Sequence, residues 1–363
     1  MPRTKHVALE AGFRLGLLRL MQLAERRRPV ILMFHRFSGN GRGHPDGLPI
    51  RLFARYMEYL SRRYRVVPLG ELVHELRGGR IRPNTAAVTV DDGYEDFFSL
   101  AVPVLRSYGI RGSVFVITDF VDGRLWPWTD RLRFVFEHAP RSPITFSYRG
   151  MTRVFDLQHD DSRRQLEEHW RAHAKTVTAA EGDELVEQLA DACGIDIPTR
   201  PPREYRPMTW EQLRALAAEG FDVGAHTRTH PILSHVGGRR LCDEIGGCKE
   251  RLEQELGRPI AHFAYPNGCR EDYTAETIEA VAHAGYTAAV TTIPGTNTAA
   301  TPIFELRRVA ADDPDLAHFA QSVSGFERWR TAARTRLATF VPSPRPRIST
   351  NGHRRQTAGE SPC

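Results

Sequence analysis

The strongest constraint on the fold of this chain is a series of short apolar runs, each followed by polar residues and then by a segment with helical periodicity. A continuous apolar run of five or six residues is typical of a strand buried on both faces. Strands that alternate with helices predict a parallel sheet covered by helices, and about seven such units allow the sheet to close into a barrel. The predicted strands are residues 30–34, 86–90, 113–118, 221–225, 260–265, 287–293 and 304–309.

Two local signals refine the helices between these strands. A helix is expected over residues 94–108, where Pro103 should kink it or end its first half. Thr209 and Gln212 form a capping-box pattern, which predicts that a helix begins at Thr209. Periodicity predicts further helices at residues 52–63, 69–76, 239–256, 274–284 and 314–324.

Three segments fall outside the regular alternation. Residues 122–206 begin with Trp126-Pro127-Trp128, continue with charged helical stretches and close with prolines, so we expect an insertion or lid within a domain at 29–325. Residues 1–28 read as an amphipathic helix whose apolar face either docks on the domain or lies on a membrane surface. Residues 341–363 are rich in Pro, Arg, Ser and Gly, which predicts a disordered tail.

Composition excludes some classes of protein. The net charge is +6 and the pI about 9.2, with arginines concentrated at both ends; they are either solvated or attract anionic lipid or an acidic polymer. No nucleic-acid-binding module is recognisable.

No apolar run approaches the roughly 20 residues that span a bilayer, and Arg14 and Arg19 interrupt any signal peptide. Five cysteines without a C-x-x-C pair suggest reduced thiols. We therefore expect a cytoplasmic protein, with membrane association left open.

The chemistry should lie where the strands end. Asp91 and Asp92 follow one apolar run, and His226 and His230 follow another. Active sites of α/β folds lie at the carboxyl ends of parallel strands. The four-residue spacing of the histidines places both imidazoles on one side of a single helical turn, where one metal can bind both. Because one carboxylate and two imidazoles leave coordination positions open, the pattern indicates a catalytic site. Zinc suits these ligands best, and cobalt, nickel, manganese or iron are also compatible.

Three motifs in this order resemble the polysaccharide deacetylases of the NodB-homology type, carbohydrate esterase family four. Thr89-Val90-Asp91-Asp92-Gly93 resembles the first motif of that family, His226-Thr227-Arg228-Thr229-His230 its second, and Phe263 to Gly268 its third. The resemblance covers roughly residues 30–325. It implies a deformed (β/α) barrel that removes N-acetyl, or sometimes O-acetyl, groups from sugars.

The resemblance also implies roles for individual residues. Asp91 matches the catalytic base, and Asp92, His226 and His230 match the metal ligands. The backbone N–H near Tyr265 is expected to help stabilise an oxyanion. Substrate contacts are expected from Tyr265, from Asn267 and from Trp128, with Trp126 and Trp210 as further aromatic candidates for stacking on sugar rings.

The chain departs from the family pattern at two places. Ala264 stands where many members carry an arginine that holds the base, and His318 is a poor match for the usual general acid because it lies in a predicted helix. Arg308, on the last predicted strand, is the candidate to hold Asp91. His35, directly after the first strand, is the candidate general acid, as in a subgroup with a Tyr/Phe-His pair at that place.

The leading hypothesis is a metal-dependent hydrolase that removes acetyl groups from N-acetylhexosamine units of a polysaccharide or its precursor. The same chemistry on a C–N bond of a non-carbohydrate substrate is a second hypothesis, and a non-catalytic glycan-binding protein is a third. An N-acetylated glycan is the expected partner, and no nucleic acid is expected. The sequence leaves the oligomeric state and any peripheral membrane contact of the N-terminal helix open.

Overall fold

The computed structural model describes residues 16–39, 41–44, 47–148, 150–174, 176–177 and 179–326. The predicted disordered tail at 341–363 lies outside the described residues. Of the predicted N-terminal helix at 1–28, the described part contains α2 (Leu17–Ala24).

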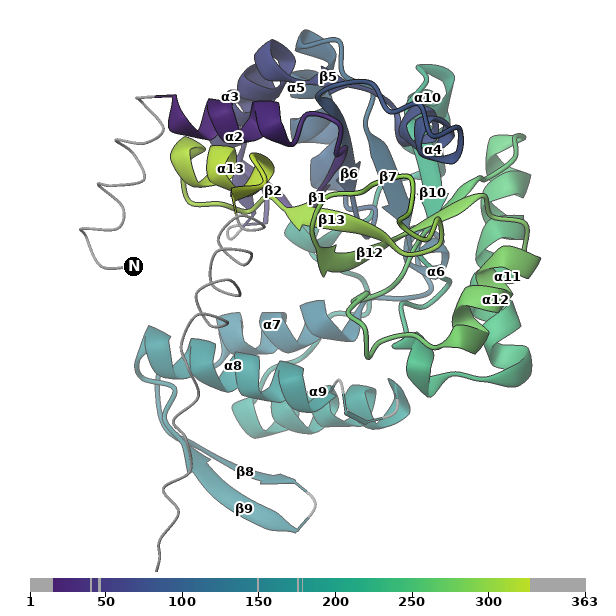
Figure 1. Ribbon diagram of the computed structural model, residues 1–363. Helices are drawn as coiled ribbons and strands as arrows, with labels where there is room; N and C mark the ends of the chain where they lie inside the picture. Colours follow the sequence, from purple (N-terminus) through teal and green to yellow (C-terminus); the bar gives the residue numbers. More distant parts are fainter. Residues whose placement is uncertain are drawn as a thin grey trace, which may run out of the picture. The chain divides into compact units, whose positions relative to one another are not determined.

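A closed barrel of seven parallel strands forms the centre of the domain, which confirms the predicted fold class (Figure 1). The strands follow one another around the barrel in the order β1, β13, β12, β11, β10, β7 and β6, and β6 pairs again with β1 to close it. A short strand, β5 (Arg65–Val66), extends one edge of β6. The barrel strands are β1 (Val30–Phe34), β6 (Thr85–Val90), β7 (Ser113–Val116), β10 (Asp222–Ala225), β11 (His262–Ala264), β12 (Ala288–Pro294) and β13 (Leu306–Ala310).

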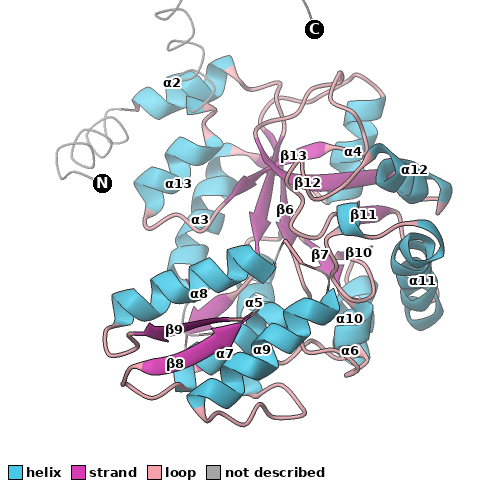
Figure 2. Ribbon diagram, turned by 90° about the horizontal axis from the view of Figure 1, so that it is seen from below, coloured by secondary structure: helices cyan, strands magenta, loops and turns pink. Residues whose placement is uncertain are grey.

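Helices surround this barrel, as the alternating pattern predicts (Figures 1 and 2). The glycine-rich loop after β1 forms a small sheet of β2 (Phe37–Gly39), β3 (Arg42–Gly43) and β4 (Leu48–Pro49). The surrounding helices are α2, α3 (Ile50–Arg63), α4 (Leu69–Arg77), α5 (Val102–Ser107), α6 (Thr118–Val121), α10 (Trp210–Ala218), α11 (Gly238–Leu256), α12 (Ala275–His283) and α13 (Leu316–Val323), with 3-10 turns at Arg203–Tyr205 and Leu233–His235.

The helix predicted over 94–108 is built differently from expectation. A π-helical turn at Phe97–Ala101 leads directly into α5, and Pro103 lies in the first turn of α5. Proline is tolerated there because the first backbone N–H groups of a helix have no intrahelical acceptor. The capping box of α10 is confirmed: the Gln212 N–H donates to Thr209 Oγ1, and the Thr209 N–H donates to Gln212 Oε1.

The segment expected as an insertion forms a layer with its own apolar core. It contains α7 (Trp128–His138), α8 (Asp160–Ala174) and α9 (Ala179–Cys193), and a hairpin of β8 (Ile144–Tyr148) and β9 (Met151–Phe155) that the sequence analysis did not predict. Figure 2 shows the three helices and the hairpin side by side. Their core includes Leu132, Phe146, Trp170, Leu185 and Leu189.

The insertion leaves the barrel after β7 and returns beside the turn that follows β6. The Met208 N–H donates to the Gly93 carbonyl at 2.9 Å, and the Glu95 N–H donates to the Arg206 carbonyl at 2.9 Å. These bonds tie the end of the insertion to the Asp91-Asp92-Gly93 turn. The insertion therefore lies at the carboxyl ends of the strands.

Gly224 gives a direct test of barrel packing. A Cβ at this position on β10 would lie 2.5 Å from a ring carbon of Phe115 and 2.9 Å from the His262 carbonyl oxygen. We expect Gly224→Ala to lower the free energy of unfolding by about 1–3 kcal/mol, because the barrel interior has no room to relax. Gly246→Ala on α11 is the matched control, since its Cβ would meet open space; it should be neutral or stabilising. Equal effects in urea unfolding would contradict this account of the packing.

Candidate active site

The predicted site residues converge at the carboxyl edge of the barrel. Asp91 and Asp92 follow β6, His226 follows β10 and His35 follows β1. Five described residues other than glycine have a positive φ, and four of them are Asp92, Thr227, His230 and Asn267 in the three motifs. Such backbone conformations are costly and concentrate at functional sites. The turns after these strands are therefore held in unfavourable conformations by the surrounding structure.

Asp92, His226 and His230 form a compact group of potential metal ligands. Asp92 Oδ1 lies 3.5 Å from His226 Nε2 and 3.7 Å from His230 Nε2. One ligand atom from each of the three residues lies within 4.8 Å of the others, and no other such group occurs among the described residues. One carboxylate oxygen and two imidazole nitrogens at this spacing fit a divalent cation.

The two histidines do not lie on a helical turn, so the geometric reason given for their proximity was wrong. Residues 226–230 form an irregular turn in which the His230 N–H donates to Thr227 Oγ1 at 3.0 Å. The buried Glu244 on α11 accepts hydrogen bonds from the backbone N–H groups of Arg228 and Thr229. This network brings the imidazole rings to 4.8 Å between centroids.

Hydrogen bonding and charge prepare these three groups to bind a cation. His226 Nδ1–H donates to the Ala264 carbonyl at 2.7 Å, which leaves the lone pair of Nε2 available on the Asp92 side. Burial alone would raise the pKa of Asp92, but the adjacent imidazoles of His226 and His230 hold it below its usual range. Burial and the neighbouring His226 lower the pKa of His230 to about 4. Burial opposes a charge on His226, yet Asp92 and Asp91 raise its pKa, so the carboxylates draw a cation or a proton to this position.

Arg308 reaches Asp91 from β13 and holds both of its carboxylate oxygens. Nη1 donates to Oδ1 and Nη2 to Oδ2, both at 2.7 Å. Arg308 is fully buried and also donates to the Thr291 carbonyl and to Thr89 Oγ1. Burial alone would raise the pKa of Asp91, but the Arg308 guanidinium lowers it. Asp91 is therefore a buried carboxylate that stays ionised.

His35 lies beside this pair and is open to solvent. Its Nε2 is 3.8 Å from Asp91 Oδ2, and its side chain is 42% exposed, whereas Asp91 and Arg308 are buried. His35 is therefore the more accessible side chain of the pair.

The structure does not place the expected substrate-contacting aromatics in this group. Trp128 packs against the core of the insertion. The Tyr265 side chain is fully buried and stacks on Tyr273 at 4.4 Å, and its backbone N–H donates to the Val290 carbonyl. Tyr265 itself thus offers neither its ring nor its N–H to a substrate. Asn267 is half-buried in the turn after β11, where its carbonyl accepts a hydrogen bond from Thr292.

Three further residues considered in the sequence also serve other purposes. Trp126 is buried against Phe134 and Tyr205. The indole N–H of Trp210 donates to Asp122 at 2.9 Å. His318 pairs with Asp315 in the first turn of α13, as expected for a packing histidine.

A network behind Asp92 was not predicted. The guanidinium of Arg36 lies 3.7 Å above the Tyr94 ring, pairs with Asp96 at 2.8 Å and donates to the Glu204 carbonyl. The Tyr94 hydroxyl donates to Asp130 of the insertion at 2.7 Å, and burial raises the pKa of Asp130 to about 7. Arg36 directly follows the candidate acid His35, and Tyr94 directly follows Gly93 of the first motif, a signal that could have marked both residues. Nothing in the local sequence connects Asp130 to the site.

The fold and the site together define a (β/α)-barrel protein with carboxylates and histidines at the carboxyl edge of its strands. The family model described as polysaccharide deacetylase matches residues 78–289. The chain belongs to the polysaccharide deacetylase family, as its motifs predicted, and is a hydrolase of that class. No significant match was found among curated protein sequences.

Solved structures of deacetylases have a similar fold. The Streptococcus pyogenes deacetylase PplD, in complex with acetate, is 17% identical, with a TM-score of 0.52 over 78% of this chain and 92% of that one. IcaB from Ammonifex degensii is 20% identical, with a TM-score of 0.52; the match covers 81% of this chain and 97% of that one. A de-N-acetylase from Aggregatibacter actinomycetemcomitans is 13% identical, with a TM-score of 0.52; the match covers 81% of this chain and 99% of that one.

The buried ion pair predicts a large effect of removing Arg308. We expect Arg308→Met to lower the free energy of unfolding by about 3–5 kcal/mol, because Asp91 would be left buried without its partner. The adjacent Arg307 is exposed, so Arg307→Met is the control and should change stability by less than about 0.5 kcal/mol. Chemical denaturation of both variants gives the comparison. A similar loss in the two would mean that Asp91 does not depend on this arginine.

Proposed function

We propose that this protein is a metal-dependent deacetylase that hydrolyses the acetamido group of N-acetylhexosamine units in a polysaccharide or its precursor. The observation that carries the proposal is the ionised Asp91, held by Arg308, directly beside the ligand group of Asp92, His226 and His230. Membership of the polysaccharide deacetylase family supports a glycan as the substrate.

The three ligand residues fit a divalent metal, with zinc as the first candidate and cobalt, nickel or manganese as alternatives. Three protein ligands leave coordination positions free for substrate and water, as in catalytic zinc sites. A metal held there supplies Lewis acidity toward oxygen.

The remaining chemistry belongs to side chains of this chain. Asp91 takes a proton from the water that attacks the acetyl carbonyl carbon, while Arg308 keeps the carboxylate oriented and ionised. His35 gives a proton to the sugar nitrogen as the C–N bond breaks. The products are acetate and the free amino sugar. The partial exposure of His35 suits a group that must regain a proton from solvent after each turnover.

Substitution of the base tests this assignment. Asp91→Asn should reduce acetate release from N-acetylated oligosaccharides by about 10²–10⁴-fold, the usual contribution of a general base. Metal content should remain near that of the unaltered protein, because Asp91 is not one of the ligands. Acetate release and metal stoichiometry are measured on the same metal-loaded samples.

Two further variants test whether the metal binds at the proposed ligands. His230→Ala should lower metal stoichiometry, whereas His235→Ala, at an exposed histidine five residues on, should not. Full activity of Asp91→Asn would remove Asp91 as the base. If the unaltered protein binds metal but releases no acetate from any glycan, the substrate is a different C–N bond or the protein only binds glycans.

A second prediction concerns the acid. His35→Gln should lower kcat on N-acetylhexosamine oligomers by about 10²–10⁴-fold, because an amine leaves poorly without a proton. Activity on 4-nitrophenyl acetate should change little, because its leaving group needs no proton. Equal losses on the two substrates would show that His35 acts in binding or folding and not as an acid.

A further inference from the structure

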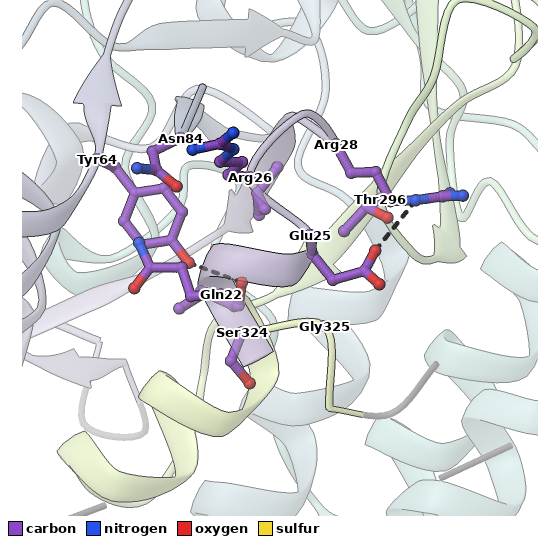
Figure 3. Close-up of a pocket in the computed structure, with 11 residues that line it drawn as sticks. Gln22, Glu25, Arg26, Arg28, Tyr64, Asn84, Thr296, Ser324 and Gly325 are labelled. Carbon is purple, nitrogen blue, oxygen red and sulfur yellow. Dashed lines mark hydrogen bonds and ion pairs between the residues drawn. The ribbon is translucent and has the colours of Figure 1, made fainter. Parts of the chain in front are cut away.

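The helix α2 lies on the barrel with one face buried and the other uncovered. Leu18 and Gln22 are buried, and the Gln22 side chain donates to the Arg63 carbonyl at 3.1 Å. The cavity beneath the helix, shown in Figure 3, has a volume of only about 10 Å³, room for one water molecule. The inner face of α2 is therefore already filled by its own domain.

The outer face of α2 carries the most conspicuous apolar exposure of the described chain. Leu20 is 65% exposed and Leu23 is 48% exposed. Among the described residues only one other large apolar side chain is exposed, Val154 on the hairpin of the insertion. Two adjacent exposed leucines on one helix face are more than the scattered apolar residues of an ordinary surface.

Basic side chains lie beside Leu23. Arg19, Arg62 and Arg63 line a surface depression of about 380 Å³ together with Leu23 and Asn84. Arg62 also pairs with Glu58 at 2.7 Å, yet its side chain remains 74% exposed. A depression that combines several guanidinium groups with a leucine suits a ligand with an anionic head and an apolar part.

The two ends of the chain are more basic than the residues between them. Residues 1–28 contain seven basic and two acidic side chains, and residues 327–363 contain eight basic and two acidic ones. Residues 29–326 therefore contain 35 basic and 40 acidic side chains. The end of the described chain lies against α2, since Ser324 and Gly325 line the same small cavity as Gln22 and Glu25. The net excess of basic side chains thus lies in the two terminal segments, one of which contains α2, while the residues between them are slightly acidic.

This surface and the candidate active site lie at opposite ends of the barrel strands. Asn84, which lines both the cavity and the depression, directly precedes β6, whereas Asp91 follows β6. Six strand residues separate the two ends by roughly 20 Å. A surface that bound to α2 would therefore leave the carboxyl edge of the barrel free.

We propose that α2 and the arginines around it form a peripheral contact with a bilayer that contains anionic phospholipid. The leucines enter the interface, and the arginines bind lipid phosphates. The exposed leucines favour lipid over nucleic acid or an acidic glycan, neither of which has an apolar region to receive them. No helix among the described residues is long and apolar enough to cross a bilayer, so the contact is a surface one. The candidate active site then faces the aqueous phase and meets glycan chains there.

Co-sedimentation of the full chain with vesicles tests this proposal. Binding is expected to vesicles of phosphatidylcholine mixed with phosphatidylglycerol, and much less to phosphatidylcholine alone. Leu20→Glu with Leu23→Glu should weaken binding by at least about tenfold. Arg19→Gln with Arg62→Gln should weaken it by roughly fivefold per arginine at low salt.

Two controls separate this surface from a general effect of charge or folding. Val154→Glu places one new carboxylate at the other exposed apolar residue, and Arg239→Gln removes an arginine on α11 whose side chain is 95% exposed; both should bind vesicles like the unaltered protein. All variants should keep their thermal stability. No binding to anionic vesicles, or binding that the α2 variants leave unchanged, would overturn the proposal. Binding to DNA or to an acidic polysaccharide but not to vesicles would overturn it as well.

Discussion

The buried pair of Asp91 and Arg308 is the interaction on which the rest of the site depends. Arg308 lies on β13 and Asp91 follows β6, and β1 pairs with both of these strands. The ion pair therefore joins two strands that are separated by a third. A buried charge without a partner is strongly destabilising, whereas a bidentate pair with further hydrogen bonds is tolerated. The ion pair between Arg308 and Asp91 thus serves both the closure of the barrel and the ionisation of Asp91.

Closure also explains how the unfavourable turns persist. Asp92, Thr227 and His230 each have a left-handed backbone, which costs on the order of 1–3 kcal/mol per residue. Each turn is held by contacts from another segment. Glu244 of α11 fixes the histidine turn, and residues 206–208 at the end of the insertion fix the turn that contains Asp92. Packing of the barrel and its helices offsets the cost of these backbone conformations. The same conformations place the three ligand atoms close to one another.

The pattern of apolar and polar residues predicted those parts of the structure that depend on burial and on the pairing of strands. The buried strands were predictable because a strand covered on both faces is mostly apolar, as residues 30–34 are. Arg308 was a good candidate to hold Asp91 because parallel strands bring their carboxyl ends together. The β8–β9 hairpin was missed because Thr145, Thr152 and Arg153 give it a polar, exposed character without a turn signal strong enough to mark it.

Other features depend on contacts that no local pattern contains. The histidine spacing suggested a helical turn, but Glu244 satisfies the backbone of that turn in another conformation. Tyr265 stands in the third motif, yet its ring is buried in the core, and Trp128 packs against the core of the insertion, because a large aromatic side chain gains more by burial than by facing solvent. Asp130 approaches the site only because the insertion folds back onto it.

The insertion therefore acts as more than a cover. Arg36 follows the candidate acid, Tyr94 follows the candidate ligand Asp92, and the cation–π contact between them links these two turns. The insertion binds both members of this contact, through the Glu204 carbonyl and the Asp130 carboxylate. The insertion therefore helps to position the turns that carry His35 and Asp92, although it contributes none of the proposed catalytic groups.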